Sequence, residues 1–350
     1  MAKNKSFLKK IIYSIIVVLL LIGGLGAYWA YKTIYQPNVN VGEKKSKIIY
    51  IPTGSTFEDV VRILSENNIL KDQASFEWLA QKKKYKNAIK SGKYRILAKM
   101  NNNELVNILR AGLQEPVVLN FNGLKTKYQL ITRFAKRIEA DSLDLIRAFD
   151  DNGYLSKYGF NEENIQALFI PDTYEFYWNT SVDQFFEKMA IEYKKFWTDE
   201  RKQKANTMNL SQTEVAVLAS IVQGEQCCDN EEKKVIAGLY LNRIKNGMKL
   251  ESDPTVIYAI GDFSVQRVYN GQLKFDSPYN TYVIEGLPPG PIGFASKSSM
   301  DAVLNYNKNN YLFMCAKPDL SGKHNFAKTY EQHKIYAQLY RKALIEKGIH

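Results

Sequence analysis

An uncharged apolar run near the N-terminus constrains the fold of this chain more than any other feature of its sequence. Residues 11–31 have the sequence IIYSIIVVLLLIGGLGAYWAY, in which no side chain carries a charge. A helix of about 20 apolar residues is long enough to cross the hydrocarbon core of a bilayer. Tyr28, Trp29 and Tyr31 belong to the residue types that lie at a membrane–water interface. The run therefore predicts a single transmembrane helix at 11–31.

Lysines on both sides of the run predict its orientation. They are Lys3, Lys5, Lys9 and Lys10 before it, and Lys32, Lys44 and Lys45 after it. The larger number of lysines at the N-terminal side favours a cytoplasmic tail at 1–10, with the rest of the chain on the outer side of the membrane. A cleaved signal peptide is the alternative, but the run is longer than the apolar part of such peptides and no clear cleavage site follows.

The remaining sequence predicts an α+β fold in two parts after a polar linker at 32–46. Residues 47–115 form a small αβ subdomain, and residues 116–345 form a larger mixed α+β domain. In the small subdomain we expect strands at 48–52 and 92–97 and helices at 57–70, 75–85 and 102–112. In the larger domain we expect a strand at 116–121, helices at 126–139, 141–150, 212–225, 230–247 and 328–347, a turn at 248–258, and short strands and loops from there to 320.

Charge and cysteine content narrow the classes of function. The net charge of +12 suits anionic surroundings such as lipid head groups or wall polymers. The lysines are scattered and no nucleic-acid motif accompanies them, so we expect no nucleic-acid partner. Cys227 and Cys228 are adjacent and make poor disulfide partners, and Cys315 leaves the count odd, so we expect no disulfide framework. The three histidines show no metal-ligand spacing, and we expect neither a metal nor a cofactor.

One carboxylate, Glu225, lies at the predicted end of the helix at 212–225. Ser211 and Glu214 form a capping box that places the helix start near Gln212. The apolar residues Val215, Leu218, Ala219 and Val222 then follow at helical spacing, and Glu225 falls on or beside their stripe. Burial and the negative end of the helix dipole both raise a carboxyl pKa, as a general acid requires. From spacing alone, a glutamate that simply reaches solvent is the better supported alternative.

Several blocks of the sequence resemble, in order and spacing, the endolytic murein transglycosylases of the YceG-like family. They are PDTYEF, ASIVQGE, VIAGLYLNRIKNGMKLESDPTVIYAIG, SPYNTYVIEGLPPGPI and KHNF, spread over residues 165–345. The family's catalytic glutamate is the second acidic residue of an IVEKE-like run. The corresponding run here is IVQGE, with Gln223 at the first acidic position, so the resemblance implies Glu225 as the catalytic residue. Cys227 and Cys228 depart from the family's pattern.

The resemblance implies a membrane-anchored lytic transglycosylase of the bacterial cytoplasmic membrane. Such an enzyme cleaves the β-1,4 bond between N-acetylmuramic acid and N-acetylglucosamine in nascent peptidoglycan without water, leaves 1,6-anhydro ends and terminates strand growth. Glu225 then acts as acid and afterwards as base, whereas water-using glycosidases need two carboxylates. The implied partners are glycan strands, the membrane and peptidoglycan synthases. Residues 47–115 resemble a LysM-like subdomain through PTGSTFEDVVRIL.

Further residues of these blocks carry the groups that a sugar site needs, which are ring faces, amides, hydroxyls and charges. The candidates for substrate binding are Asn242, Arg243, Asp253, Thr255, Tyr279, Asn280, Tyr282 and His324. Each has a structural alternative, such as a helix brace, a turn residue or a core tyrosine. Two other functions stay open at this point. One is a muramidase that uses water with Glu225 and Asp253, and the other is a non-catalytic anchor that binds the wall.

Overall fold

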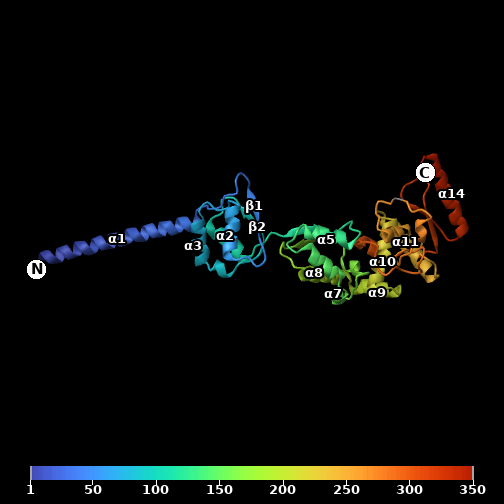
Figure 1. The fold of residues 1–350 in the computed structure, drawn as a ribbon, viewed down its shortest axis with the longest axis horizontal. Helices are drawn as coiled ribbons and strands as arrows, with labels where there is room; N and C mark the ends of the chain where they lie inside the picture. Colours follow the sequence, from blue (N-terminus) through green and yellow to red (C-terminus); the bar gives the residue numbers. More distant parts are fainter. Residues whose placement is uncertain (1, 266, 349–350) are drawn as a thin grey trace. The chain divides into compact units, whose positions relative to one another are not determined.

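The computed structural model describes residues 2–265 and 267–348, and the chain divides into two compact units (Figure 1). The first unit comprises Met1–Val117 and Glu175–Thr180, and the second comprises Val118–Tyr174 and Ser181–His350.

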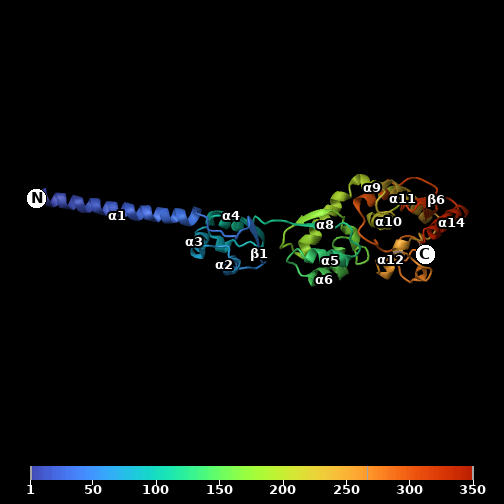
Figure 2. The same ribbon diagram turned by 90° about the horizontal axis from the view of Figure 1, so that it is seen from above.

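The first unit begins with one continuous helix, α1 (Ala2–Tyr35), in both views (Figures 1 and 2). Its segment Phe7–Tyr35 is long and apolar enough to cross a membrane, and its apolar window is not buried in the protein. The apolar run predicted to span the membrane therefore lies within a longer helix. Met1 and the side chains of Lys3 and Lys5, on which the predicted orientation partly depends, lie outside the described residues.

Part of the segment predicted to be a linker, residues 32–46, packs into the first unit, although most of its residues are exposed. Helix α1 continues to Tyr35, and Val39 is only 2% exposed. The Asn38 side-chain amide donates 2.8 Å hydrogen bonds to the Asp72 carbonyl and to Oδ1 of Asn102. The polar composition of this segment suggested a solvated spacer, but its amide groups find partners inside the fold. This packing explains why part of a segment predicted to be a free linker belongs to the folded first unit.

The first unit is completed by a two-stranded antiparallel sheet with helices around it. Ser46 lies opposite Leu97 and Ile51 opposite Gly92, which directs alternate residues of both strands into one core. The strands and helices expected between residues 48 and 112 are present, with ends that differ by a few residues. They are β1 (Ser46–Ile51), α2 (Phe57–Glu66), α3 (Gln73–Lys82), the 3-10 turn η1 (Tyr85–Asn87), β2 (Gly92–Leu97) and α4 (Asn102–Ala111).

The second unit is mostly helical and contains the antiparallel sheet of β5 and β6, whereas the paired strands β3 and β4 each have residues assigned to both units. The predicted mixed α+β class is thus confirmed. From residue 117 onward the elements are β3 (Val117–Asn120), α5 (Lys127–Ala135), α6 (Ser142–Asp150), α7 (Asn152–Ser156), η2 (Ile165–Leu168), β4 (Thr173–Phe176), α8 (Val182–Phe196), α9 (Asp199–Thr207), α10 (Gln212–Glu225), α11 (Asn230–Lys245), α12 (Asp253–Ile260), η3 (Gln272–Lys274), α13 (Lys297–Leu304), β5 (Phe313–Ala316), β6 (His324–Ala327) and α14 (Tyr330–Glu346).

Helix α10 is the central element of the second unit. Its residues from Val215 to Val222 are all buried, and it packs against α11, α12 and α13. The capping box of Ser211 and Glu214 is present, so the helix begins where the sequence predicted. The sequence predicted one buried apolar face, but the structure buries this part of α10 on all sides. Such a helix needs apolar residues around its whole circumference.

The sequence prediction was wrong between residues 248 and 320 in two places. The turn expected at Asp253–Pro254 is the first turn of α12, because proline is well accommodated at the start of a helix, where its missing N–H costs nothing. Helix α13 (Lys297–Leu304) also occupies a region where only strands and loops were expected.

Candidate active site

Glu225 is the last residue of α10 and lies at the wall of a pocket of about 980 Å³. The backbone leaves the helix at Gln226, which is extended, with φ of −140° and ψ of 106°. The side chain of Glu225 is half-buried and lines the pocket. The helix end therefore presents a carboxyl group to a recess rather than to bulk solvent.

Two hydroxyl groups hold one oxygen of this carboxyl. The Tyr240 hydroxyl from α11 donates to Oε1 of Glu225 at 2.8 Å, and the Ser252 hydroxyl, just before α12, donates to the same oxygen at 2.5 Å. Among residues 2–265 and 267–348, no group donates a hydrogen bond to Oε2.

The surroundings of Glu225 act on its pKa in both directions. Burial raises the pKa and is the largest influence, while the hydrogen bonds from Ser252 and Tyr240 and the electrostatic effect of His324 lower it. The charge of Asp253 raises it further, and the net direction is upward from the ordinary value. A carboxyl with a raised pKa keeps its proton closer to neutral pH, where a general acid needs it.

Gly224 allows α12 to approach the end of α10. A Cβ atom at this position would lie 2.6 Å from Cβ of Pro254, closer than side chains tolerate. Pro254 follows directly on Ser252 and Asp253, so this close approach places both of them beside Glu225. The glycine in the IVQGE run thus has a packing reason that the sequence pattern alone did not indicate.

Ser252 is itself fixed by two buried threonines. The Ser252 N–H donates to Oγ1 of Thr281 at 3.0 Å, and the Thr255 hydroxyl donates to the Ser252 carbonyl at 2.6 Å. Oγ1 of Thr255 and Oγ1 of Thr281 are 2.8 Å apart. Thr255, a candidate for substrate binding, is fully buried and supports Ser252 rather than lining the pocket.

The pocket brings four of the candidate binding residues together with Glu225, namely Arg243, Asp253, Tyr282 and His324. The Tyr282 hydroxyl donates to Oδ1 of Asp253 at 2.7 Å. Burial, and then this hydrogen bond and charge, raise the pKa of Tyr282, so its hydroxyl remains a donor. Asp253 is exposed and starts α12, so it borders the pocket without being enclosed by it.

His324 is the first residue of β6 and is oriented by a buried carboxylate. Oε1 of Glu232 lies 2.7 Å from Nδ1 of His324 and accepts the His324 backbone N–H at 2.9 Å. Glu232 is only 8% exposed, so the imidazole is held firmly at the pocket wall. Glu232 was not singled out from the sequence, because its partner lies 92 residues further along the chain.

Asn242 and Arg243 both brace the backbone of the loop that leads to β5. Asn242 Nδ2 donates to the carbonyls of Asn309 at 2.9 Å and Tyr311 at 3.1 Å. The Arg243 guanidinium donates to the carbonyls of Lys249 at 2.7 Å and Leu312 at 2.8 Å, and pairs with Glu251. These contacts match the structural alternative considered for both residues.

Tyr279 and Asn280 lie outside the pocket lining and shape the loop before it. The Tyr279 hydroxyl donates to the Glu163 carbonyl at 3.1 Å. Asn280 is fully buried, and its Nδ2 donates to the carbonyls of Leu273 at 3.0 Å and Phe275 at 2.8 Å. Both residues therefore hold backbone in place near the pocket, and neither presents its polar group to it.

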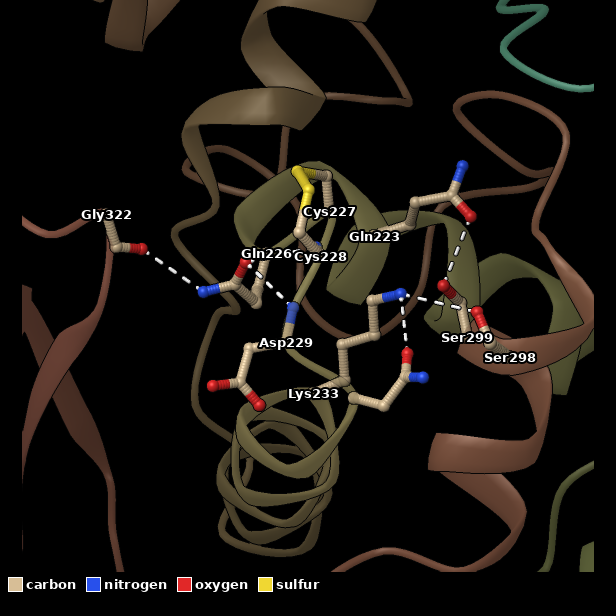
Figure 3. Close-up of a disulfide and its surroundings, with 10 residues drawn as sticks. Gln223, Gln226, Cys227, Cys228, Asp229, Lys233, Ser298, Ser299 and Gly322 are labelled. Atoms are coloured by element: carbon tan, nitrogen blue, oxygen red, sulfur yellow. Dashed lines mark hydrogen bonds between the residues drawn. A yellow bond between two sulfur atoms is a disulfide. The ribbon is translucent and has the colours of Figure 1, made fainter.

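Cys227 and Cys228 form a disulfide, so the expectation that these neighbours make poor disulfide partners was wrong (Figure 3). Their Cα atoms are 3.8 Å apart, the spacing of neighbours in a trans chain. The prediction treated that proximity as an obstacle, but the sharp turn between α10 and α11 brings both sulfur atoms together. Among the described residues, no group of three or more histidine, cysteine or acidic side chains is arranged to hold a metal.

Gln223 turns away from the pocket and braces the start of α13. Its Oε1 accepts the Ser299 hydroxyl at 3.1 Å (Figure 3). The same oxygen accepts the Ser296 N–H at 2.8 Å, and Nε2 donates to the Phe294 carbonyl at 3.2 Å. An amide suits this position because it offers both a donor and an acceptor. Gln223 therefore joins α10 to the start of α13, while the hydrogen bonds that the Glu225 carboxyl accepts from described residues come from Tyr240 and Ser252.

Comparisons with known proteins agree on one family. The YceG-like family matches residues 49–338. A protein of Bacillus subtilis (strain 168) described as an endolytic murein transglycosylase is 30% identical over 349 residues, which covers 94% of this chain and 93% of that protein. One of the same description from Streptococcus pneumoniae serotype 2 is 25% identical over 361 residues, and the match spans 64% of its length. The crystal structure of a YceG-like protein from Listeria monocytogenes gives a TM-score of 0.54 at 26% identity, covering 84% of this chain and 99% of that one.

Proposed function

Because this chain belongs to the YceG-like family, we propose that Glu225 is the catalytic residue of a lytic transglycosylase that cuts peptidoglycan strands internally. The enzyme is a lyase of the peptidoglycan-cleaving class, like the curated relatives that match it over 94% of its length. The observation that carries the assignment is the carboxyl of Glu225, which has a raised pKa, two hydroxyl donors on one oxygen and a pocket beside it.

In the first step Glu225 acts as a general acid. Oε2 carries the proton and donates it to the glycosidic oxygen between N-acetylmuramic acid and N-acetylglucosamine, which breaks the bond to C1 of the muramic sugar. Oε1 keeps its hydrogen bonds from Tyr240 and Ser252 throughout. As the carboxyl loses its proton, these two donors stabilise the negative charge that develops on it.

In the second step the same carboxylate acts as a base. It takes the proton from the C6 hydroxyl of the muramic sugar while that oxygen bonds to C1, which gives the 1,6-anhydro end and restores the acid. The attacking group belongs to the same sugar, so proximity replaces the activated water of a hydrolase. One carboxyl with a tuned pKa is therefore enough, and Asp253 has an electrostatic role, raising the pKa of Glu225.

In this proposal some of the candidate binding residues contact the glycan directly, and the others support the residues that do. Tyr282, Asp253 and His324 line the pocket and contact the glycan, and Arg243 supports the pocket wall from beneath. Asn242, Thr255, Tyr279 and Asn280 act indirectly, through the loops that their side chains hold.

The apolar helix α1 anchors the enzyme in the cytoplasmic membrane, with the N-terminus in the cytoplasm and the second unit on the outer side. The length and hydropathy of Phe7–Tyr35 support this placement. A LysM-like subdomain follows at 47–115, with the catalytic domain at 116–345. Anchoring confines the active site to the layer where synthases release new strands, which raises its effective concentration there. Cutting in that layer terminates strand elongation, and the synthases are the expected partners.

Digestion in water enriched in oxygen-18 distinguishes this proposal from its rivals. We expect the full-length chain in detergent micelles to release 1,6-anhydro ends from uncrosslinked strands with no heavy oxygen incorporated. A muramidase that uses Glu225 and Asp253 with water would instead give reducing ends that carry one oxygen-18 atom. A wall-binding anchor would retain the strands without cutting them.

A further inference from the structure

A second hollow opens beside Glu225 and contains the disulfide. It has a volume of about 670 Å³ and is lined by residues 224–231 and 321–323. Within the described part of the chain, Glu225 is the one lining residue that it shares with the larger pocket. A polymer cut in its interior extends from the broken bond in both directions. Two recesses that meet at the acid suit such a substrate.

The disulfide of Cys227 and Cys228 gives this hollow an apolar, polarizable patch. Both side chains are exposed and line the hollow. Sulfur and methylene groups are weakly hydrated and contact carbon well. A sugar ring has an apolar face of C–H groups and a polar rim, and the hollow offers Asn230, Ser321 and Lys323 as polar groups. Its surface thus matches both chemical aspects of a pyranose.

The backbone that carries the disulfide is tied down on both sides (Figure 3). Oε1 of Gln226 accepts the N–H groups of Cys228 at 3.1 Å and Asp229 at 3.3 Å, and its Nε2 donates to the Gly322 carbonyl at 3.1 Å. Asp229 also pairs with Lys323 at 2.7 Å. Both walls of the hollow are therefore joined, and its shape is formed before any ligand binds.

We propose that this hollow is a saccharide subsite of the enzyme and that the Cys227–Cys228 disulfide is the platform for one sugar ring of the strand. The inference rests on the proposed function, since it takes the cleaved bond to lie at Glu225. The platform exists only in the oxidised protein. Without the S–S bond, each cysteine side chain turns about its own χ1 torsion between separate staggered rotamers. Two free thiols are therefore not held together as one surface.

The test compares the oxidised and reduced forms of the full-length chain in detergent micelles. A phosphine reductant takes oxygen from water to become a phosphine oxide, and delivers two electrons and two protons that convert the disulfide to two thiols. KM and kcat are measured on long uncrosslinked strands and on short oligosaccharides. The Cys227→Ser/Cys228→Ser variant, with and without reductant, controls for effects of the phosphine elsewhere. If that variant does not fold, the wild-type comparison carries the test.

For long strands we expect reduction to raise KM by about five- to tenfold, as the loss of one apolar ring contact implies, with kcat changed by less than about twofold. The serine variant should have the same KM for long strands as the reduced enzyme, and the reductant should not change that KM. A short oligosaccharide that spans the cleaved bond but does not reach the disulfide should show no change. An unchanged KM for long strands, or an equal rise for both lengths, overturns the proposal, because a merely structural disulfide would affect both substrates alike.

Binding of strands to the Glu225→Gln variant separates this inference from the proposed function. Its Kd for long strands should rise by the same factor on reduction, whether or not the wild-type chain cleaves them. Labelling of Cys227 and Cys228 by a thiol reagent before any reduction would show that the disulfide is absent, and would overturn the proposal. Cleavage that survives in Glu225→Gln would contradict the proposed function alone.

Discussion

The hydroxyl of Ser252 lies 2.5 Å from Oε1 of Glu225, although the two residues are 27 positions apart in the chain. The contact exists because Gly224 lets Pro254 pack against the end of α10. It links the start of α12 to the proposed acid, so we expect substitutions at the end of α10 or the start of α12 to change the pKa of Glu225.

Removing this donor tests the link directly. Ser252→Ala should raise the pKa of Glu225, because the hydrogen bond favours its charged form. The alkaline limb of the kcat profile should then move to higher pH, and kcat should fall by about ten- to a hundredfold, since the base step loses a donor to a charged group. Ser156→Ala, an exposed serine of α7, is the matched control. An unshifted profile for Ser252→Ala would contradict the link.

Asp253 should act on the pKa of Glu225 in the opposite sense. Its negative charge raises that pKa, so Asp253→Asn should lower it and move the alkaline limb of the kcat profile to lower pH. The products should still carry 1,6-anhydro ends, since asparagine keeps an acceptor for the Tyr282 hydroxyl. Asp199→Asn, fully exposed on α9, serves as control. Complete loss of cleavage would favour a direct chemical role for Asp253.

Gly224→Ala should lower the Tm and should also disturb the hydrogen bond between Ser252 and Glu225. The new methyl group would meet Pro254 at 2.6 Å, so α12 must shift and carry Ser252 away from Glu225. Overpacking of this kind costs about 1–3 kcal/mol, which corresponds to a Tm lowered by about 2–8 °C. Gly271→Ala, where no atom lies within 4 Å of the added methyl, should leave the Tm unchanged. Equal Tm values for the two variants would show that the close packing of Pro254 on Gly224 is not needed for stability.

The ionisation of Glu225 also affects stability, with a defined sign. Burial raises its pKa above the ordinary 4.5. The folded protein thus binds this proton more tightly than the unfolded chain does, and the stability gained is complete below pH 4.5 and lost as pH rises through the folded pKa. Glu225→Gln mimics the neutral acid, so it should melt about 1–4 °C higher than wild type near pH 8 and equally at low pH. A variant that melts lower at every pH would contradict this sign.

Short-range sequence patterns correctly predicted that Glu225 lies at the end of a helix. The roles of Asn242 and Arg243 stayed undecided, because they depend on partners far away in the chain. The capping box at Ser211 fixes where α10 begins, and the helical apolar spacing carries it to Glu225. The same local logic identified the helix bearing Asn242 and Arg243. It could not decide between bracing and binding, because their partners lie 67 and 69 residues away.

The unpredicted features depend on packing that no local pattern encodes. Neither Tyr240 nor Ser252 was singled out from the sequence, and only the fold brings both hydroxyls to one carboxyl oxygen. Average geometry disfavoured a disulfide between neighbouring cysteines, whereas the turn between α10 and α11 makes this adjacent pair possible. In each case the tertiary structure overrode a sound general preference.

The central claim, that Glu225 is both acid and base, is tested most directly by mass spectrometry of uncrosslinked glycan strands. Full-length wild-type and Glu225→Gln chains in detergent micelles would digest the same strands in parallel, with melting curves to show that both are folded. We predict internal fragments with 1,6-anhydro ends from the wild type and about a thousandfold fewer from the variant. Anhydro ends released by folded Glu225→Gln at a rate close to that of the wild type would contradict the claim.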